Sequence, residues 1–204
     1  SRQVLNCSVD GGRTFSQVTR FTTSTIRAVY VPYDVPQTIY VGTETGVGGA
    51  FVKRSGDNGA TWEDIAPTEA DGYPRGAPGA YAIAGSPVSP GEVLLLGEKD
   101  PNLHGIENRK LYHTTDGGNS WFKRFDFSGW PQEVTGIGIN YHNPKRLYIL
   151  ADSGAPGVFL STDGGFTWLT KTGTLSGTWG EGIAIWDLSW SALAGDLWAP
   201  CECP

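Results

Sequence analysis

One eight-residue pattern occurs four times along the chain, and it restricts the fold more than any other feature. Each copy reads hydroxyl, any, Asp, any, Gly, any, Ser or Thr, aromatic. An Asp at the start of a tight turn accepts hydrogen bonds from backbone N–H groups two residues on, and the Gly supplies a positive φ without a Cβ penalty. The pattern therefore predicts four copies of one strand-turn-strand unit, spanning Ser8–Phe15, Ser55–Trp62, Thr114–Trp121 and Ser161–Trp168.

Short apolar runs separated by turn residues fill the rest of the chain, without a helical period. Four predicted strands, for example, precede the third motif: Trp62–Ile65, Ala80–Ala84, Val93–Gly97 and Lys110–Thr114. The motifs recur roughly every 50 residues, a period typical of β-propeller blades with four strands each. We expect one all-β domain over 1–204, a small propeller of about four blades at residues 22–69, 70–128, 129–174, and 175–204 plus 1–21.

The two ends of the chain each supply part of a blade. The last blade lacks strands, and the N-terminal residues hold surplus ones, so we expect the strand near 4–8 to complete it, within the chain or by exchange between copies. Large residues such as Val29, Val31 and Ile83 alternate with small ones such as Ala28 and Ala82 on the innermost strands. Large faces meeting small faces would let the blades interdigitate around the axis.

The cysteines also lie at the two ends of the chain. The expected seam brings Cys7 near Cys201 or Cys203, and a disulfide there would close the ring. The remaining thiol would form an intermolecular bond or stay as a free reactive group. The sequence has no Met, so either an N-terminal segment has been removed or the chain is an excised piece. A removed secretion signal would suit both the missing Met and the cysteines, so we expect an extracellular or cell-surface location.

The repeated motif resembles the Asp-box, or BNR repeat, of sialidases, xyloglucanase-type glycoside hydrolases, sortilin-like receptors and photosystem assembly factors. The resemblance covers all four repeats and implies a β-propeller. It also implies that the motif is a structural turn on the face opposite the active site. By this resemblance the four motif aspartates have structural roles: Asp10, Asp57, Asp116 and Asp163. Those families usually have six or more blades, so a ring of four would depart from them.

The loops that lead into the innermost strands carry polar residues, and these loops lie on the face opposite the motifs. Aligning those strands places Arg27, Tyr81, Thr135 and Glu181 at equivalent positions. A sialidase-like site needs an arginine cluster for a substrate carboxylate and a Tyr nucleophile polarised by a Glu. Arg27, Tyr81 and Glu181 can be interpreted in this way, but only one Arg falls in the set. The alternative is that these residues line the mouth of a narrow channel.

The other loops of this face carry acidic residues and tryptophans. Carboxylate pairs beside exposed Trp are what glycoside cleavage and sugar stacking require. A purely binding face, for a glycan or a protein, is the alternative. The candidate catalytic carboxylates are Glu98, Glu133, Asp152 and Glu181, and the candidate ligand-binding residues are Trp130, Trp179, Glu44 and Asp100.

Charge and motifs exclude several other classes of function. The formal net charge is −6 and the basic residues are scattered, which argues against a nucleic-acid partner. No apolar run approaches the ~20 residues that span a bilayer. No metal-ligand or phosphate-binding motif is present, so we expect neither metal nor cofactor. Three functions remain: a binding or assembly module, which we favour, a glycoside hydrolase or a fragment of one, and a structural fibre subunit that forms homo-oligomers.

Overall fold

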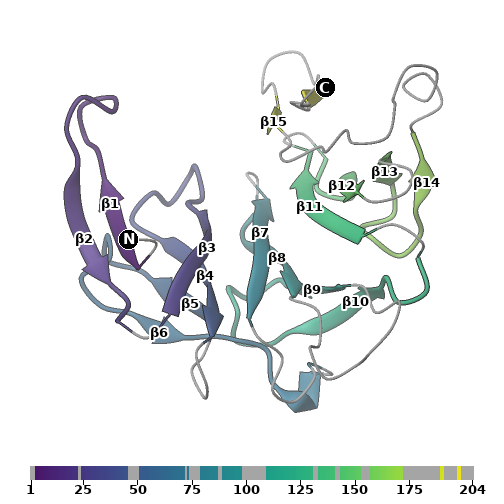
Figure 1. Ribbon diagram of the computed structural model, residues 1–204, viewed down its shortest axis with the longest axis horizontal. Coiled ribbons are helices and arrows are strands. Elements are labelled where there is room, and N and C mark those ends of the chain that lie inside the picture. The colour runs from purple at the N-terminus through teal and green to yellow at the C-terminus, as the bar shows by residue number, and fades with distance from the viewer. Residues whose placement is uncertain are drawn as a thin grey trace.

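The chain folds almost entirely into antiparallel β-sheets. The computed structural model describes residues 3–22, 24–45, 51–71, 73, 79–86, 89–97, 109–130, 133–140, 143–152, 157–171, 189–190 and 197–198. Within these residues there are three four-stranded sheets and two two-stranded sheets (Figure 1). The only helix in the described part is a short 3-10 turn, Glu69–Asp71. No helix there is long and apolar enough to cross a membrane.

Each four-stranded sheet is built from strands that are consecutive in the sequence. Blade 1 contains β3 (Ser24–Tyr30), β4 (Ile39–Thr45), β5 (Val52–Ser55) and β6 (Glu63–Asp64). Blade 2 contains β7 (Ala80–Ser86), β8 (Ser89–Gly97), β9 (Lys110–Thr114) and β10 (Phe122–Asp126). Blade 3 contains β11 (Glu133–Ile139), β12 (Leu147–Asp152), β13 (Gly157–Ser161) and β14 (Leu169–Thr170). The predicted four-stranded blade is confirmed in these three sheets.

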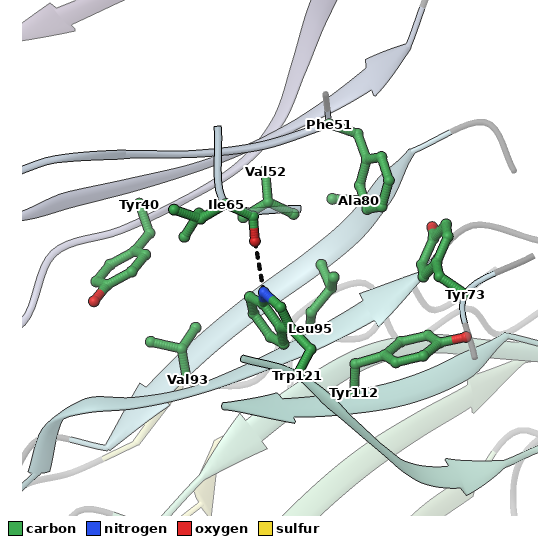
Figure 2. Packing of buried hydrophobic residues seen from close by; sticks show 10 residues of the cluster. All are labelled: Tyr40, Phe51, Val52, Ile65, Tyr73, Ala80, Val93, Leu95, Tyr112 and Trp121. Carbon is green, nitrogen blue, oxygen red and sulfur yellow. Dashed lines mark hydrogen bonds between the residues drawn. The ribbon is translucent and has the colours of Figure 1, made fainter. Parts of the chain in front are cut away.

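The core lies between successive blades. Val93 and Leu95 of β8 point into a cluster shared with blade 1, whereas Leu94 and Leu96 point into a cluster shared with blade 3. All four side chains are buried, because successive residues of a strand face opposite sides of its sheet. In the first cluster, Trp121 reaches across from blade 2 and donates its indole N–H to the Ile65 carbonyl oxygen at 2.5 Å (Figure 2). Blade 2 therefore buries both of its faces, as a propeller blade requires.

The two ends of the chain do not complete a common blade in this structure. β1 (Val4–Cys7) pairs with β2 (Ser16–Arg20), forming the N-terminal hairpin. β15 (Ser189–Trp190) pairs with β16 (Leu197–Trp198) in a separate sheet. The N-terminal hairpin and blade 3 lie at opposite ends of the row of sheets (Figure 1). The expected pairing of the two ends within one chain is therefore not formed among the described strands.

The innermost strand of blade 1, β3, is more exposed than the sequence predicts. Val29 and Val31 were expected to interdigitate at a crowded axis, but they are 45% and 46% exposed. A different small residue makes a close contact between blades 1 and 2, where Gly42 of β4 faces Ala80 and Ile83 of β7. The expected burial of the two valines was therefore wrong for this structure, and the alternation on the innermost strands stays a prediction.

Candidate functional site

The four repeated motifs fold into the same hydrogen-bonded turn. In each, the first hydroxyl donates to one oxygen of the Asp carboxylate at 2.7–2.8 Å. The Ser or Thr four residues after the Asp donates its backbone N–H to that same oxygen and its hydroxyl, at 2.6 Å, to the other. The second residue after the Asp donates its backbone N–H to the oxygen of the first hydroxyl at 2.7–2.9 Å.

This geometry corrects one detail of the sequence interpretation. The carboxylate accepts the N–H four residues on in all four copies, rather than two residues on. The two residues after each Asp both have positive φ, as in Gly11 and Gly12 at 71° and 88°. In the second motif the first of these two positions is Asn58, at φ 58°, because Asn adopts this backbone conformation more readily than most residues. The second is Gly in every copy.

The hydrogen bonds to the motif carboxylates lower the pKa values of all four groups. Hydrogen bonds from Thr14 and Ser8 lower the pKa of Asp10 to about 2, and those from Thr61 and Ser55 do the same for Asp57. The pKa values of Asp116 and Asp163 are lowered by the equivalent bonds. A carboxylate stabilised in its charged form by its own turn is suited to hold a loop, not to donate a proton.

The motifs lie at the opposite end of the sheets from the predicted site residues. In blade 3, Ser161 at the start of the fourth motif pairs with Leu147, which in turn pairs with Ile139 at the end of β11. Glu133 and Asp152 pair at the other end of the same sheet. We call that end the upper face.

The innermost strand of each blade has a β-bulge at its upper end. The pairing register shifts between Ile26 and Ala28 in β3, between Ala80 and Ala82 in β7, and between Val134 and Gly136 in β11. The extra residues at these bulges are Arg27, Tyr81 and Thr135. They are three of the four positions that the sequence alignment made equivalent. Bulges redirect side chains and are common beside functional sites.

On blade 1 the bulge residue forms an ion pair with a second predicted site residue. Arg27 Nη2 lies 2.8 Å from Glu44 Oε2, and the two side chains are 32% and 44% exposed. Glu44 also forms an isolated antiparallel bridge with Gly79, two residues before the bulge of blade 2. The pair therefore lies at the contact between blades 1 and 2.

On blade 2 the bulge residue packs against an arginine that the sequence analysis missed. The Arg109 guanidinium carbon lies 3.5 Å from the centroid of the Tyr81 ring. The same guanidinium donates at 2.7 Å to Glu133 and at 2.6 Å to the Val134 carbonyl oxygen, both of β11. Arg109 is 4% exposed, whereas the Glu133 side chain is 35% exposed. The structure thus joins Tyr81 and Glu133, two predicted candidates, through Arg109.

The third bulge residue differs from the other two. Thr135 carries a buried hydroxyl that has no hydrogen-bond partner among the described residues. Together the three bulges and their partners form a row along the upper face, which we call the upper row: Arg27, Glu44, Tyr81, Arg109, Glu133 and Thr135. Its described acidic and basic groups alternate, and each carboxylate accepts from an arginine.

The remaining predicted site residues are not part of the upper row. Trp130 is half-buried, with its ring 4.7 Å from that of Phe159 and 5.1 Å from that of Phe127. It therefore packs against an aromatic cluster while remaining partly exposed, and its predicted role in ligand binding stays a prediction. The side chain of Asp152 is not described, and Glu98, Asp100, Trp179, Glu181, Cys201 and Cys203 lie outside the described residues. Cys7 is an exposed free thiol, and its predicted disulfide stays a prediction.

The arginines of the upper row are already paired within the chain. A sialidase-like site requires several arginines free to bind a substrate carboxylate, yet Arg27 and Arg109 each bind a glutamate of this chain. The retaining and inverting mechanisms of other glycoside hydrolases require two carboxyl groups that exchange protons with the substrate and with water. The described residues contain no group of three or more His, Cys, Asp or Glu suited to a metal ion. The upper row is arranged to join blades and to present fixed polar groups.

Comparison with known proteins gives relatives at the level of structure. No family model matches the chain, and no curated protein matches it. YCF48 from Cyanidioschyzon merolae is similar with a TM-score of 0.62 and 18% identity over 90% of this chain and 52% of that chain. The GH74 xyloglucanase from Xanthomonas campestris has a TM-score of 0.59 and 20% identity over 83% of this chain and 27% of that chain. The Niastella koreensis GH74 enzyme has a TM-score of 0.57 and 21% identity over 83% and 28%.

The identities are low, so these similarities bear on the fold alone. The chain spans about half the length of the YCF48 chain that it matches and about a quarter of each GH74 enzyme. Three sheets of consecutive antiparallel strands, each packed against the next, agree with this likeness. The chain is therefore a β-propeller protein.

Proposed function

We propose that this protein is an Asp-box β-propeller that acts as a non-catalytic binding and assembly module. Its ligand is a glycan or a protein segment, it needs no cofactor, and it works outside the cell or on its surface. The four identical turns support the Asp-box assignment. The observation that carries the binding role is the upper row, whose charged groups are held in place by one another.

Partial exposure makes the upper row suitable for recognition. Arg27 and Glu44 remain about one-third and two-fifths exposed in their ion pair, and a guanidinium has five N–H donors, more than one pair can use. Tyr81 is fixed by the bulge and by the guanidinium against its ring. Groups fixed before binding lose little conformational entropy when a ligand docks, which favours affinity.

The test is a binding screen with a matched pair of variants. Wild-type protein would be applied to arrays of glycans and of peptides, and hits would be measured by calorimetry. We expect Arg27→Ala to weaken binding about tenfold or more, while Arg13→Ala, on the motif face, leaves it unchanged. Equal binding by wild type and Arg27→Ala would contradict a role for the upper row.

A glycoside hydrolase is the second candidate, and one comparison favours it. Two of the similar structures are GH74 enzymes, one of them a xyloglucanase. If this chain is such an enzyme or a piece of one, Glu98, Glu133, Asp152 and Glu181 are the candidate carboxylates. A reducing-end assay on xyloglucan with each residue replaced singly by Ala decides the matter. Activity lost in any single variant would favour hydrolysis over passive binding.

Assembly is the second part of the proposal. Exchange of terminal strands between copies would complete the half-blades that the structure leaves separate, and a disulfide from Cys7 to Cys201 or Cys203 would then join chains. Denaturing gel mobility with and without reductant tests the disulfide. A covalent species that disappears on reduction is the expected result.

A further inference from the structure

The three joints between neighbouring sheets follow one rule. In each, the third residue after a motif aromatic contacts the second glycine of the next motif. A Cβ placed on Gly118 would lie 2.5 Å from Ile65 Cδ1, and one on Gly165 would lie 3.1 Å from Arg124 Cγ. Gly59 faces Val18 in the same way, more closely still. Each motif thus presents a flat glycine backbone to the outer strand of the preceding sheet.

The motif aromatic docks at the same joints. Trp62 packs edge-on against Phe21 at 5.2 Å. Trp121 donates to the Ile65 carbonyl, and Trp168 packs against Phe127 at 5.8 Å. All three joints are formed by a motif and by the strand that follows the previous motif, so they share one orientation.

The first motif has the same parts, but no described residue docks on it. Gly59, Gly118 and Gly165 are buried, whereas Gly12 is exposed and no described atom lies within 4 Å of a Cβ placed on it. Phe15, the aromatic of this motif, is 67% exposed. Within the part of the chain that the structure describes, the N-terminal hairpin therefore ends the row of sheets with a motif that no other sheet contacts.

Blade 3 carries the other half at the opposite end of the row. The third residue after Trp168 is Lys171, which is exposed, whereas Ile65 is buried and Val18 and Arg124 are half-buried. A backbone hydrogen bond from Lys171 N–H to the Val158 carbonyl fixes its place on the sheet. Arg124 shows that the aliphatic stem of a long basic side chain fits against a motif glycine.

We propose that two copies of this chain associate head to tail, with Lys171 of each copy docked on Gly12 and Phe15 of the other. Within one molecule, the N-terminal hairpin and blade 3 lie at opposite ends of the row of sheets (Figure 1). A heterologous contact used twice closes a ring of two copies. The chain spans 52% of the length of the similar YCF48 structure, so two copies supply about the length of that propeller. This inference deepens the assembly part of the proposed function and does not depend on ligand binding.

The charges at this joint give the inference a distinctive test. Phe166, the residue after Gly165, lies 4.3 Å from the Arg124 guanidinium. By the same rule Arg13, the residue after Gly12, lies beside Lys171 of the other copy. Like charges there oppose association, so added salt is expected to strengthen it. Arg13→Glu places a carboxylate beside the lysine and is expected to tighten the dimer several-fold at low salt.

The experiment is sedimentation velocity over a range of protein and salt concentrations. We expect a dimer that Phe15→Ser weakens about tenfold or more and Arg13→Glu strengthens. Phe122→Ser is the matched control, because Phe122 is 59% exposed and belongs to no joint in the rule. A monomer at all concentrations would overturn the inference, as would equal effects of Phe15→Ser and Phe122→Ser.

Cross-linking identifies the partner at the joint. In a background with Cys7, Cys201 and Cys203 replaced by Ser, a mixture of Arg13→Cys and Lys171→Cys proteins is expected to form a disulfide dimer on oxidation. A bond formed only within one chain that carries both cysteines would overturn the inference, since the chain would then close on itself. Loss of dimerisation with intact ligand binding, or the reverse, separates this inference from the upper-row proposal.

Discussion

Replacing the second glycine of two motifs by alanine separates two contributions to the free energy of unfolding: backbone strain, and a steric clash between neighbouring sheets. Gly118 and Gly12 occupy the same turn position, at φ 98° and 88°. A Cβ on Gly118 would lie 2.5 Å from Ile65 Cδ1 and 3.0 Å from Ile65 Cβ, whereas none on Gly12 meets a described atom within 4 Å. Gly118→Ala and Gly12→Ala therefore share the strain and differ in packing.

The expected difference in the free energy of unfolding follows from these distances. A left-handed backbone costs a non-glycine residue about 1–2 kcal/mol, and both variants carry this cost. Ile65 is 7% exposed, and its Cβ cannot move away without its backbone. Overpacking of this kind costs about 1–3 kcal/mol. We expect Gly118→Ala to be less stable than Gly12→Ala by that amount.

Thermal unfolding measures this difference. For a domain of this size 1 kcal/mol corresponds to roughly 2–4 °C in Tm, so the two variants should differ by roughly 2–12 °C. The protein is kept dilute, so that association at the first motif does not contribute. Equal Tm values for the two variants would refute the conclusion that the motif glycines are selected for joint packing as well as for φ.

Three further predictions concern other contacts of the structure. Gly85→Ala places a methyl group against the Tyr30 ring and should destabilise the protein by about 1–3 kcal/mol by urea unfolding, while Gly56→Ala, with open space around it, should have little effect. Arg109→Met removes hydrogen bonds to Glu133 and to a backbone carbonyl and should cost about 2 kcal/mol or more in the same assay. The pKa of Asp57 is about 2 in the folded protein, against 3.8 for an ordinary Asp. The charged carboxylate therefore stabilises the fold above about pH 4, and this stabilisation is lost as the pH falls towards 2. Asp57→Asn should make the free energy of unfolding depend less on pH in this acidic range.

Each of these predictions has an outcome that contradicts it. Similar midpoints for the two glycine variants would show that the joint between β3 and β7 tolerates added volume. An unchanged midpoint for Arg109→Met would mean that the buried guanidinium does not join blades 2 and 3. The same pH dependence for Asp57→Asn and wild type in the acidic range would mean that the turn does not favour the charged carboxylate.

The repeated turn was predictable because it is local. The hydrogen bonds of the Asp carboxylate and of the first hydroxyl lie within eight residues, so the order of hydroxyl, Asp, Gly and aromatic is visible in the sequence. The three complete blades follow from the same repeats, since their strands pair with sequence neighbours. The equivalence of Arg27, Tyr81 and Thr135 was also visible, although the bulge that makes them equivalent was not.

The features that were missed depend on long-range contacts. Arg109 comes before an apolar strand and has no motif of its own; it meets Tyr81 and Glu133 only through the packing of two blades. Trp130 was expected on the surface because it lies between predicted strands, yet its ring packs against Phe159 of blade 3 as well as against its sequence neighbours Phe125 and Phe127. Counting strands in the sequence could not establish which sheet edges meet. The expected pairing of the N-terminal strand with the last blade is therefore not seen among the described strands.

All three joints use the same contact between a motif and the preceding sheet, so the free energy of folding depends mainly on contacts between neighbouring sheets. Each sheet stabilises only its immediate neighbours, so the stability of the molecule is close to a sum of blade terms and nearest-neighbour terms. Removing the N-terminal hairpin should then cost one such term and leave the other joints intact. By the same reasoning a blade could be duplicated once the residue that meets the motif glycine is matched, because every joint uses the same two positions.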